Sequence, residues 1–307
     1  MIFVRSVDPE GYPFNSEHYA SAYLDLLLSL KARGAKAYFA TDNSTYVGRG
    51  VFTKAYTTDS KVPVEEFELV RDIKADLVFE KGGFVGAGVL VLNPEFVHRI
   101  TSSKLETYKY FAKYQPRTVI CANQQAVERA IEDMPGELVV VKEPVSNRGQ
   151  AVQIGKKAQI LHQVPQRYPI IVQEFIDTSV GIKGYVEGIH DVRIKIAGGE
   201  VLAGMIRTPA PGEYRANLAQ GGTARHLYVD EIPPEAFKLA REIDCYFEKY
   251  PRYYAIDFAY TANGWKLIEL NSKPGFAPLA ESPQAKYGTE KLADYLIKIS
   301  SPDGIKR

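Results

Sequence analysis

YYAIDFAYTANGWKLIELNSKPGF, residues 253–276, is the stretch that decides the fold of the C-terminal half of this chain. Two apolar runs rich in aromatic and β-branched residues flank residues 261–264, Thr-Ala-Asn-Gly, which favour a tight turn. The pattern predicts a β-hairpin. Alternation along the second strand places Glu269 and Asn271 on one face, about 7 Å apart. Pairing about the turn brings Asp257 across from them.

These three oxygen-bearing side chains have two interpretations. A half-exposed hairpin with a hydrated polar face explains them structurally. Two carboxylates on one partly buried face, however, repel each other by a few kcal/mol at an effective dielectric constant of about 20. A hard cation removes that cost, and all-oxygen ligands suit Mg²⁺ or Mn²⁺ better than Zn²⁺. The polar turn at residues 271–275 could hold a ligand beside such a metal.

Composition limits the class of protein. The chain has 307 residues, 45% of them hydrophobic, which is enough for cores in two or three lobes. Its 38 basic and 37 acidic residues give a formal net charge of +1, so neither nucleic acid nor an anionic membrane is an expected partner. The N-terminus lacks a signal-peptide pattern and no apolar run approaches about 20 residues, so we expect a soluble cytoplasmic protein. Cys121 and Cys245 lie in apolar stretches and are expected to be reduced and buried.

The sequence pattern of the N-terminal part predicts a small parallel α/β lobe. Residues 2–4, 37–40 and 75–79 have the composition of buried strands, and residues 16–31 have apolar side chains at helical spacing. A charged connection interrupted by proline joins the second strand to the third. The glycines of residues 81–88 match neither the dinucleotide-binding fingerprint nor the Walker pattern, so a flexible loop is preferred to a phosphate site.

The rest of the chain alternates helices and strands. A helix is expected to begin with Thr101 or Ser102 as its N-cap, and an apolar strand, residues 138–141, ends on Lys142. Alone, a lysine in that position is more typical of a solvated strand end. Asp191, Arg193 and Lys195 share one face of a later strand, which a salt-bridge ladder explains. Further helices are expected at residues 123–133, 233–250 and 289–299, and further strands at residues 118–121, 169–175 and 201–207.

The order of these segments resembles the ATP-grasp superfamily. A helix lysine and a strand-end lysine precede Gln-Glu-Phe-Ile, Asp-Val-Arg, Arg-Ala-Asn-Leu-x-x-Gly-Gly, Ile-Asp-Phe and Glu-Leu-Asn-Ser-Lys-Pro-Gly. Over about residues 99–300 the chain is most similar to the branch of the ribosomal-protein glutamate ligase, the carrier-protein ligases of lysine and arginine biosynthesis, and glutathione synthetase. The resemblance implies an α/β (α+β) ATP-grasp fold. Its parts would be an N-terminal parallel α/β domain (1–98), a lid subdomain (99–172) and a C-terminal catalytic subdomain with an antiparallel sheet (173–307).

The resemblance also implies a nucleotide site. Lys104 and Lys142 would contact the ATP phosphates, and Lys142 would also contact the adenine. A hinge would read the adenine edge through backbone groups of Gln173, Glu174, Phe175 and Ile176. Asp177 is the candidate for the ribose hydroxyls. The loop after Lys142, residues 143–149, has one glycine where relatives are glycine-rich.

The same resemblance implies the reacting centre. Asp257, Glu269 and Asn271 would ligate two Mg²⁺ ions, or alternatively Mn²⁺, that bridge the phosphates. Arg215 and Asn217 would hold the terminal phosphate and the acyl phosphate. Taken alone, the polar loop that carries them, residues 214–224, is better explained as a surface loop. Arg193 would face the reacting carboxylate. Lys273 stands where close relatives tend to have a small residue, and it is either a clamp for a substrate carboxylate or a solvent-facing lysine.

The function implied is an ATP-dependent carboxylate–amine ligase. A carboxylate attacks the γ-phosphoryl group, and an amine then attacks the acyl phosphate, which releases ADP and phosphate. The expected partners are a small-molecule carboxylate and an amine, on an amino acid or a small peptide, and further copies of the chain in a homo-oligomer. Two alternatives are an ATP-binding module without turnover, as in the synapsins, and a small-molecule kinase on the same fold.

Overall fold

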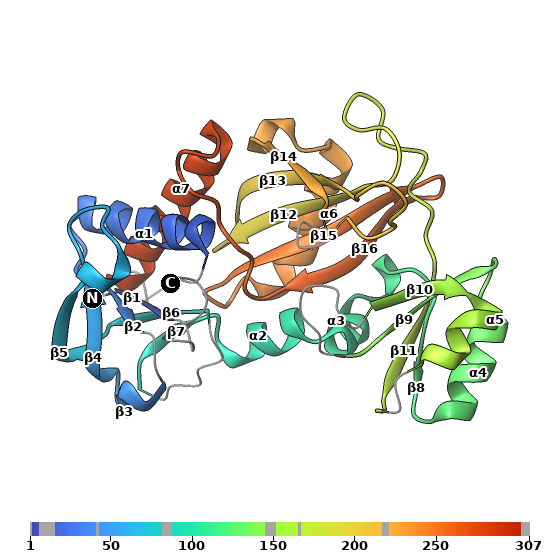
Figure 1. Cartoon of the computed structure of the whole chain (residues 1–307), viewed down its shortest axis with the longest axis horizontal. Coiled ribbons are helices and arrows are strands. Elements are labelled where there is room, and N and C mark those ends of the chain that lie inside the picture. The colour runs from blue at the N-terminus through green and yellow to red at the C-terminus, as the bar shows by residue number, and fades with distance from the viewer. Residues whose placement is uncertain are drawn as a thin grey trace.

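The computed structural model describes residues 2–5, 16–40, 43–81, 88–144, 152–164, 167–216 and 221–301. Within these ranges the chain forms three β-sheets with helices packed around them (Figure 1). The N-terminal lobe lies at one end, a small four-stranded sheet at the other, and the sheet that contains the hairpin lies between and above them. No helix in the described ranges is long and apolar enough to span a membrane.

The N-terminal sheet has the strand order β3-β4-β2-β1-β6-β7, with β5 paired to β4. Its strands are β1 (Ile2–Arg5), β2 (Ala37–Ala40), β3 (Tyr46–Gly48), β4 (Val51–Thr57), β5 (Glu68–Lys74), β6 (Leu77–Glu80) and β7 (Leu90–Leu92). β2, β1 and β6 are parallel, as predicted, and β7, which was not predicted, pairs in parallel with β6. β3, β4 and β5 are antiparallel and were missed, because this segment was interpreted as a connection. It folds because Phe52, Ala55 and Ile73 pack with Ala40 and Val78 of the parallel strands in a small core.

Two helices from opposite ends of the sequence lie side by side over this lobe (Figure 1). α1 (Glu17–Ala32) and α7 (Pro283–Ser300) share one apolar core, to which Leu26, Leu27 and Leu296 contribute fully buried side chains. α7 begins before the predicted residue 289, because Ser282 caps it by accepting a hydrogen bond from the Ala285 amide at 3.0 Å. The C-terminal helix therefore completes the core of the N-terminal lobe.

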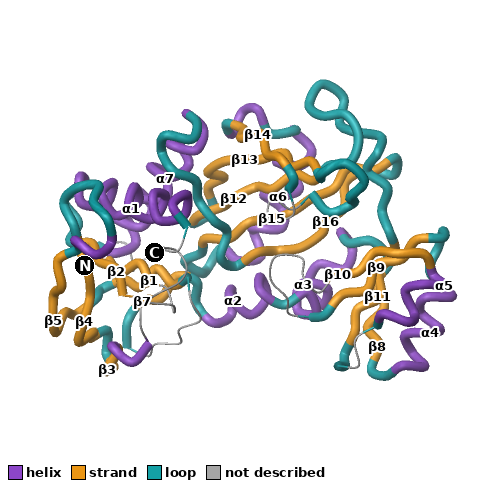
Figure 2. The backbone as a smooth tube through the Cα atoms, in the orientation of Figure 1, coloured by secondary structure: helices purple, strands orange, loops and turns teal. Residues whose placement is uncertain are grey.

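The small sheet is antiparallel, in the order β10-β9-β11-β8, with α4 (Gln124–Asp133) and α5 (Lys157–Ile160) on its outer side (Figure 2). Its strands are β8 (Thr118–Cys121), β9 (Leu138–Lys142), β10 (Val152–Lys156) and β11 (Ile170–Glu174). β11 continues past residue 172, where the sequence suggested a subdomain boundary. Of the two cysteines, both free, Cys121 is buried in this lobe, whereas Cys245 is exposed, so the prediction that both are buried is wrong for Cys245.

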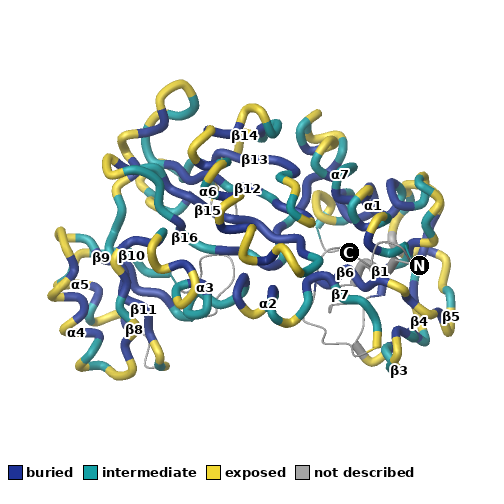
Figure 3. The backbone as a smooth tube through the Cα atoms, turned by 180° about the vertical axis from the view of Figure 1, so that it is seen from behind, coloured by how far each residue is buried: buried dark blue, intermediate teal, exposed yellow. Residues whose placement is uncertain are grey.

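The central sheet is also antiparallel, in the order β14-β13-β12-β15-β16. Its strands are β12 (Asp191–Ala197), β13 (Glu200–Thr208), β14 (Thr223–Leu227), β15 (Tyr253–Thr261) and β16 (Gly264–Asn271). One face is apolar and packs on α6 (Pro234–Asp244), with Val192, Ile194 and Ile196 in the core. The helix predicted for residues 233–250 thus ends at Asp244 and continues as a 3₁₀ turn. β15 is buried almost throughout (Figure 3), whereas β16 is half-buried along most of its length, so the expected half-exposed hairpin describes β16 but not β15.

Two short helices connect the N-terminal lobe to the small sheet. α2 (Glu95–Ser102) and α3 (Lys104–Phe111) are separated by Ser103, whose backbone is extended and whose hydroxyl accepts a hydrogen bond from the Glu106 amide at 3.3 Å. Ser103 is therefore the N-cap, and the prediction of Thr101 or Ser102 is wrong, because Thr101 lies inside α2 and bonds its own helix. The break places Lys104 at the start of α3, which packs against β16.

Candidate functional site

The face of the central sheet opposite α6 carries the polar side chains. Strand register places Arg193 of β12 opposite Asp257 of β15, and Asp257 opposite Glu269 of β16. The neighbouring row contains Lys195, Ala255 and Asn271 in the same order across the sheet. Because side chains alternate between faces, both rows point to the same side. The hairpin pattern predicted this meeting of Asp257 with Glu269.

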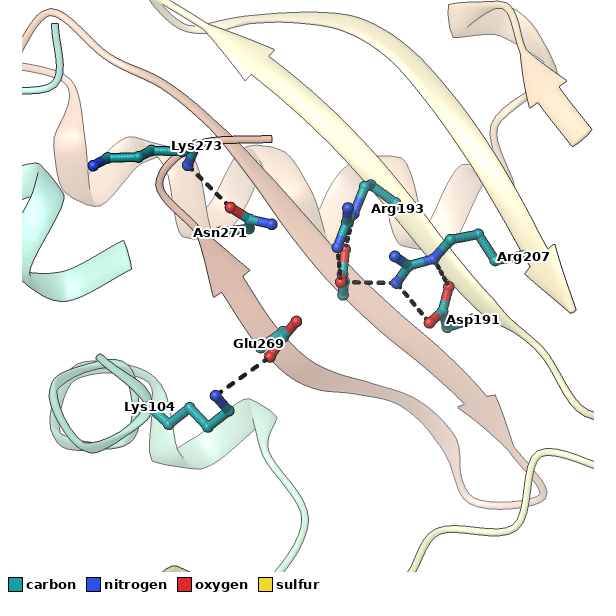
Figure 4. A network of polar contacts seen from close by, with 8 residues as sticks. Lys104, Asp191, Arg193, Arg207, Glu269, Asn271 and Lys273 are labelled. Atoms are coloured by element: carbon teal, nitrogen blue, oxygen red, sulfur yellow. Dashed lines mark hydrogen bonds and ion pairs between the residues drawn. The ribbon is translucent and has the colours of Figure 1, made fainter. Parts of the chain in front are cut away.

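Four charged side chains form a buried network at one end of these rows (Figure 4). Arg193 donates two hydrogen bonds to Asp257, at 2.7 and 2.5 Å. Arg207 of β13 donates two to Asp191, at 2.6 Å each, and a third to Asp257 at 2.8 Å. Sequence reasoning missed Arg207. The feature that could have identified Arg207 is its position opposite Asp191 in the next antiparallel strand. The salt bridges therefore run from strand to strand and not along β12 alone.

The two carboxylates that Arg207 binds, Asp191 and Asp257, have pKa values shifted in opposite directions. Burial acts to raise the pKa of Asp257, but Arg193 and Arg207 outweigh it and lower that pKa to about 2. Burial raises the pKa of Asp191 to about 6, against the opposing effect of Arg207 and with a contribution from the neighbouring Asp257. As pH falls, Asp191 is therefore protonated first, and Asp257 keeps its charge.

The oxygen donors of this face suit a hard divalent cation. Asp257 accepts one hydrogen bond on Oδ1 and two on Oδ2, and a carboxylate has about four lone-pair sites, so Oδ1 can still ligate a metal. Glu269 is about one-third exposed, and Asn271 Oδ1 accepts a hydrogen bond from the Lys273 amide at 3.0 Å. No cluster of three or more His, Cys, Asp or Glu side chains with metal-binding geometry occurs in the described ranges. The oxygen donors on this face are the carboxylates of Asp257 and Glu269 and the amide of Asn271, and ligands of these types fit Mg²⁺.

Two lysines approach the same face from α3 and the small sheet. Lys104 Nζ lies 3.9 Å from Glu269 Oε2, and the two side chains point toward each other (Figure 4). Lys142 is only 7% exposed, so it is not a solvated strand end. It donates a 2.6 Å hydrogen bond to the Gln173 side chain, which in turn donates to Thr118 at 2.8 Å. Burial lowers the pKa of Lys142 to about 8, and Glu269 opposes this while Lys104 adds to it.

The hinge residues predicted for adenine recognition begin with Gln173 and Glu174 at the end of β11 and continue into the segment after it. Glu174 pairs with the main chain of Arg117, through both its amide and its carboxylate. Phe175 packs edge-on against Tyr214, with ring centroids 5.1 Å apart. Ile176 is half-buried and Asp177 is exposed, where its carboxylate accepts the Ser179 amide. Gln173 engages its neighbours through its side chain, which sequence reasoning did not anticipate.

The loop after β13 is only partly described. Arg215 bonds the Val152 carbonyl of β10 at 3.4 Å and Glu213 at 3.3 Å, which ties this loop to the small sheet. Asn217 lies outside the described residues, and so do residues 145–150 of the loop after Lys142 and residues 82–87 of the glycine-rich loop.

The N-terminal lobe holds the segment that follows β16. Asn93 exchanges hydrogen bonds with the main chain of Tyr253, at 2.6 and 2.7 Å, and donates to the Ser272 carbonyl at 2.9 Å. Lys81 donates to the Pro274 carbonyl at 2.7 Å. Lys273 lies between these contacts, and its charge helps to lower the pKa of Lys81. Sequence reasoning missed Asn93 and Lys81, because no local pattern relates residues about 160 to 190 positions apart.

Comparison with known proteins decides the family. A family model described as the RimK-like ATP-grasp domain matches residues 101–292. The chain belongs to this family. It is an ATP-grasp ligase, and it shares with that family the use of ATP. A protein described as probable alpha-L-glutamate ligase 2 of Hahella chejuensis is 26% identical over 229 residues, which cover 70% of this chain and 69% of that protein.

Solved structures agree with the fold of this RimK-like chain. A RimK domain ATP-grasp protein from Sphaerobacter thermophilus has a TM-score of 0.61 at 16% identity, over 97% of this chain and 100% of that one. The ATP-grasp ligase PsnB, in complex with a phosphomimetic variant of its minimal precursor, Mg and ADP, has a TM-score of 0.63 at 15% identity over 98% of both chains. The three sheets are therefore arranged as in an ATP-grasp ligase.

Proposed function

We propose that this RimK-like chain is an ADP-forming ligase that joins the carboxylate of an amino acid or small peptide to an amine. The observation that carries the proposal is the approach of Lys104 to Glu269 at 3.9 Å, beside the Arg193–Asp257 pair, with Lys142 near enough for the Glu269 charge to act on its pKa. Cations for the phosphates and oxygen donors for a metal thus lie on one face. The name of the Hahella chejuensis relative supports glutamate as one substrate.

The reaction consists of two displacements. An oxygen of the substrate carboxylate forms a bond to the γ-phosphorus of ATP, and the bond to the β–γ bridging oxygen breaks to release ADP. The amine nitrogen then forms a bond to the acyl carbon, the carbon–oxygen bond to phosphate breaks, and the nitrogen loses a proton. Positioning and charge neutralisation dominate such a reaction, so no nucleophilic side chain is required.

Each residue contributes charge or position. Lys104 and Lys142 would bind phosphate oxygens, and Asp257, Glu269 and Asn271 would hold two Mg²⁺ ions, with Mn²⁺ as an alternative. Bound ions of this kind neutralise the phosphates during transfer. Arginine has five N–H donors. Two of those of Arg193 bind Asp257, so the others remain for the reacting carboxylate.

The test is magnesium-dependent release of ADP and phosphate in the presence of hydroxylamine, with a panel of amino acids and dipeptides. Hydroxylamine traps an acyl phosphate as a hydroxamate, so a hydroxamate formed with one carboxylate supports the proposal and identifies the donor. A reaction without magnesium is the control. ADP release with neither hydroxamate nor free phosphate would replace the proposal with a kinase. ATP binding without turnover on every substrate would replace it with a binding module.

A further inference from the structure

The N-terminal lobe holds the segment that follows Asn271, the candidate metal ligand at the end of β16. Asn93 donates a hydrogen bond to the Ser272 carbonyl at 2.9 Å. Contacts with the same lobe continue along residues 274–279 and join Lys81 to the Pro274 carbonyl at 2.7 Å, Tyr23 to Phe276 with ring centroids 4.7 Å apart, and Asp25 to the Leu279 amide at 2.8 Å. The path of the chain directly after Asn271 therefore depends on the N-terminal lobe as well as on the central sheet.

Asn93 takes the place of a strand residue beside β15. The ladder between β15 and β16 ends with Ala255 opposite Asn271, and a longer ladder would next bring Lys273 opposite Tyr253. Instead, the Asn93 side chain accepts a hydrogen bond from the Tyr253 amide at 2.6 Å and donates one to the Tyr253 carbonyl at 2.7 Å. Tyr253 is buried, and buried main-chain groups require such partners. Asn93 thus allows the chain to leave the sheet after Asn271 while the main chain of Tyr253 stays paired.

The chain that leaves the sheet forms a turn closed by the Asn271 side chain. Asn271 Oδ1 accepts a hydrogen bond from the Lys273 amide at 3.0 Å (Figure 4), as asparagine side chains do in Asx turns. Ser272 lies between these two residues, is buried, and has its carbonyl bound by Asn93. Because the turn forms only while residues 271–273 keep this path, the contact with Asn93 fixes the orientation of the Asn271 carboxamide.

We propose that Asn93 is a positioning residue for metal binding, which holds Tyr253 and Ser272 so that the Asn271 oxygen stays oriented for Mg²⁺. The inference rests on the metal assignment in the proposed function and adds the residue that supports one of the ligands. Residues that orient a metal ligand through hydrogen bonds commonly change metal affinity by about 10- to 100-fold without touching the metal. Asn93 suits this role because both donors and the acceptor of its carboxamide are used, and because it is only 9% exposed.

The experiment measures how much Mg²⁺ increases nucleotide affinity, so that it does not depend on turnover. The full chain is titrated by calorimetry with AMP-PNP, a non-hydrolysable ATP analogue, once in saturating Mg²⁺ and once in EDTA. The ratio of the two Kd values is the magnesium enhancement. Asn93→Ala should lower this enhancement by about tenfold or more and change the affinity in EDTA by less than about twofold. The matched control Asn123→Ala removes the N-cap of α4 on the small sheet and should keep the wild-type enhancement.

A double variant distinguishes positioning from a general structural role. If Asn93 acts through Asn271, Asn93→Ala should cause no further loss in a chain that already carries Asn271→Ala, because the ligand that it orients is gone. Two independent losses would instead multiply. Circular dichroism establishes that each variant is folded. Asn93→Asp keeps the shape and the acceptor but not the donors, so it should resemble Asn93→Ala and serves if that variant is not folded.

The outcomes separate this inference from the ligase proposal. A folded Asn93→Ala variant with the wild-type enhancement, or losses that multiply in the double variant, overturns the positioning role and leaves the metal assignment in place. A wild type without any magnesium enhancement overturns both. The expected loss in Asn93→Ala, together with no hydroxamate in the turnover assay, keeps the positioning role and refutes the ligase. Hydroxamate formation with an unchanged enhancement in Asn93→Ala does the reverse.

Discussion

Replacing Arg207 tests whether the buried charge network depends on one shared guanidinium. The Arg207 side chain is 9% exposed and donates three charge-assisted hydrogen bonds, two to Asp191 and one to Asp257. Arg207→Met removes all three and leaves Asp191 without the partner that binds both of its oxygens. Breaking a buried pair from one side costs about 3–5 kcal/mol. We therefore expect the free energy of unfolding to fall by about that amount.

The assay is urea unfolding followed by circular dichroism. At a slope of about 3 kcal/mol per molar urea, that loss moves the midpoint down by about 1–1.7 M. The double variant Asp191→Leu/Arg207→Met removes one charge of each sign and leaves Asp257 paired with Arg193. Since a buried pair can be replaced by apolar residues at little cost, it should recover most of the loss. The exposed pair Lys113–Glu242 is the control, and Lys113→Met should leave the midpoint unchanged.

Two results would refute this reasoning. If Arg207→Met unfolds at the wild-type midpoint, the shared guanidinium is not what holds the two carboxylates. If the double variant is as unstable as the sum of the two single variants, Asp191 and Arg207 are not coupled. The first result would also leave Arg193 as the main cause of the low pKa of Asp257.

Three further predictions concern the candidate site. Glu269→Gln should lower kcat by about 100-fold or more and keep most nucleotide affinity, because it weakens metal binding more than adenine contacts; near-normal turnover would remove the metal assignment. Lys273→Ala should raise the KM of one substrate selectively, and a uniform change, or none, would exclude it as a clamp. The pKa of Lys142 is about 8 and phosphate favours its charged form. Nucleotide affinity, measured by calorimetry, should therefore weaken as pH rises above about 8, by up to about tenfold per pH unit. Lys142→Arg should lose this pH dependence. A wild-type affinity that stays unchanged up to pH 9.5 would contradict the prediction.

The sequence predicted features that depend on neighbouring residues. Alternation in the hairpin placed Asp257 and Glu269 face to face, and the register of β15 with β16 has them opposite each other. Periodicity also found α1, α4 and the strands of the small sheet. Prediction from neighbouring residues failed where the local pattern fitted two structures about equally well. Residues 46–74 were interpreted as a connection although they form three strands, and the N-cap of α3 was placed before Ser103.

What the sequence determined by itself was the order of the elements and which side chains share a strand face, since both follow from the geometry of consecutive residues. Only the tertiary structure decided which partners those side chains meet. Arg207 reaches Asp257 across β12, and Asn93 binds the main chain of Tyr253 from another lobe. The same holds for the burial of Lys142 and its pKa. Burial and charge pairing depend on distances through space, and a linear sequence does not contain those distances until the chain has packed.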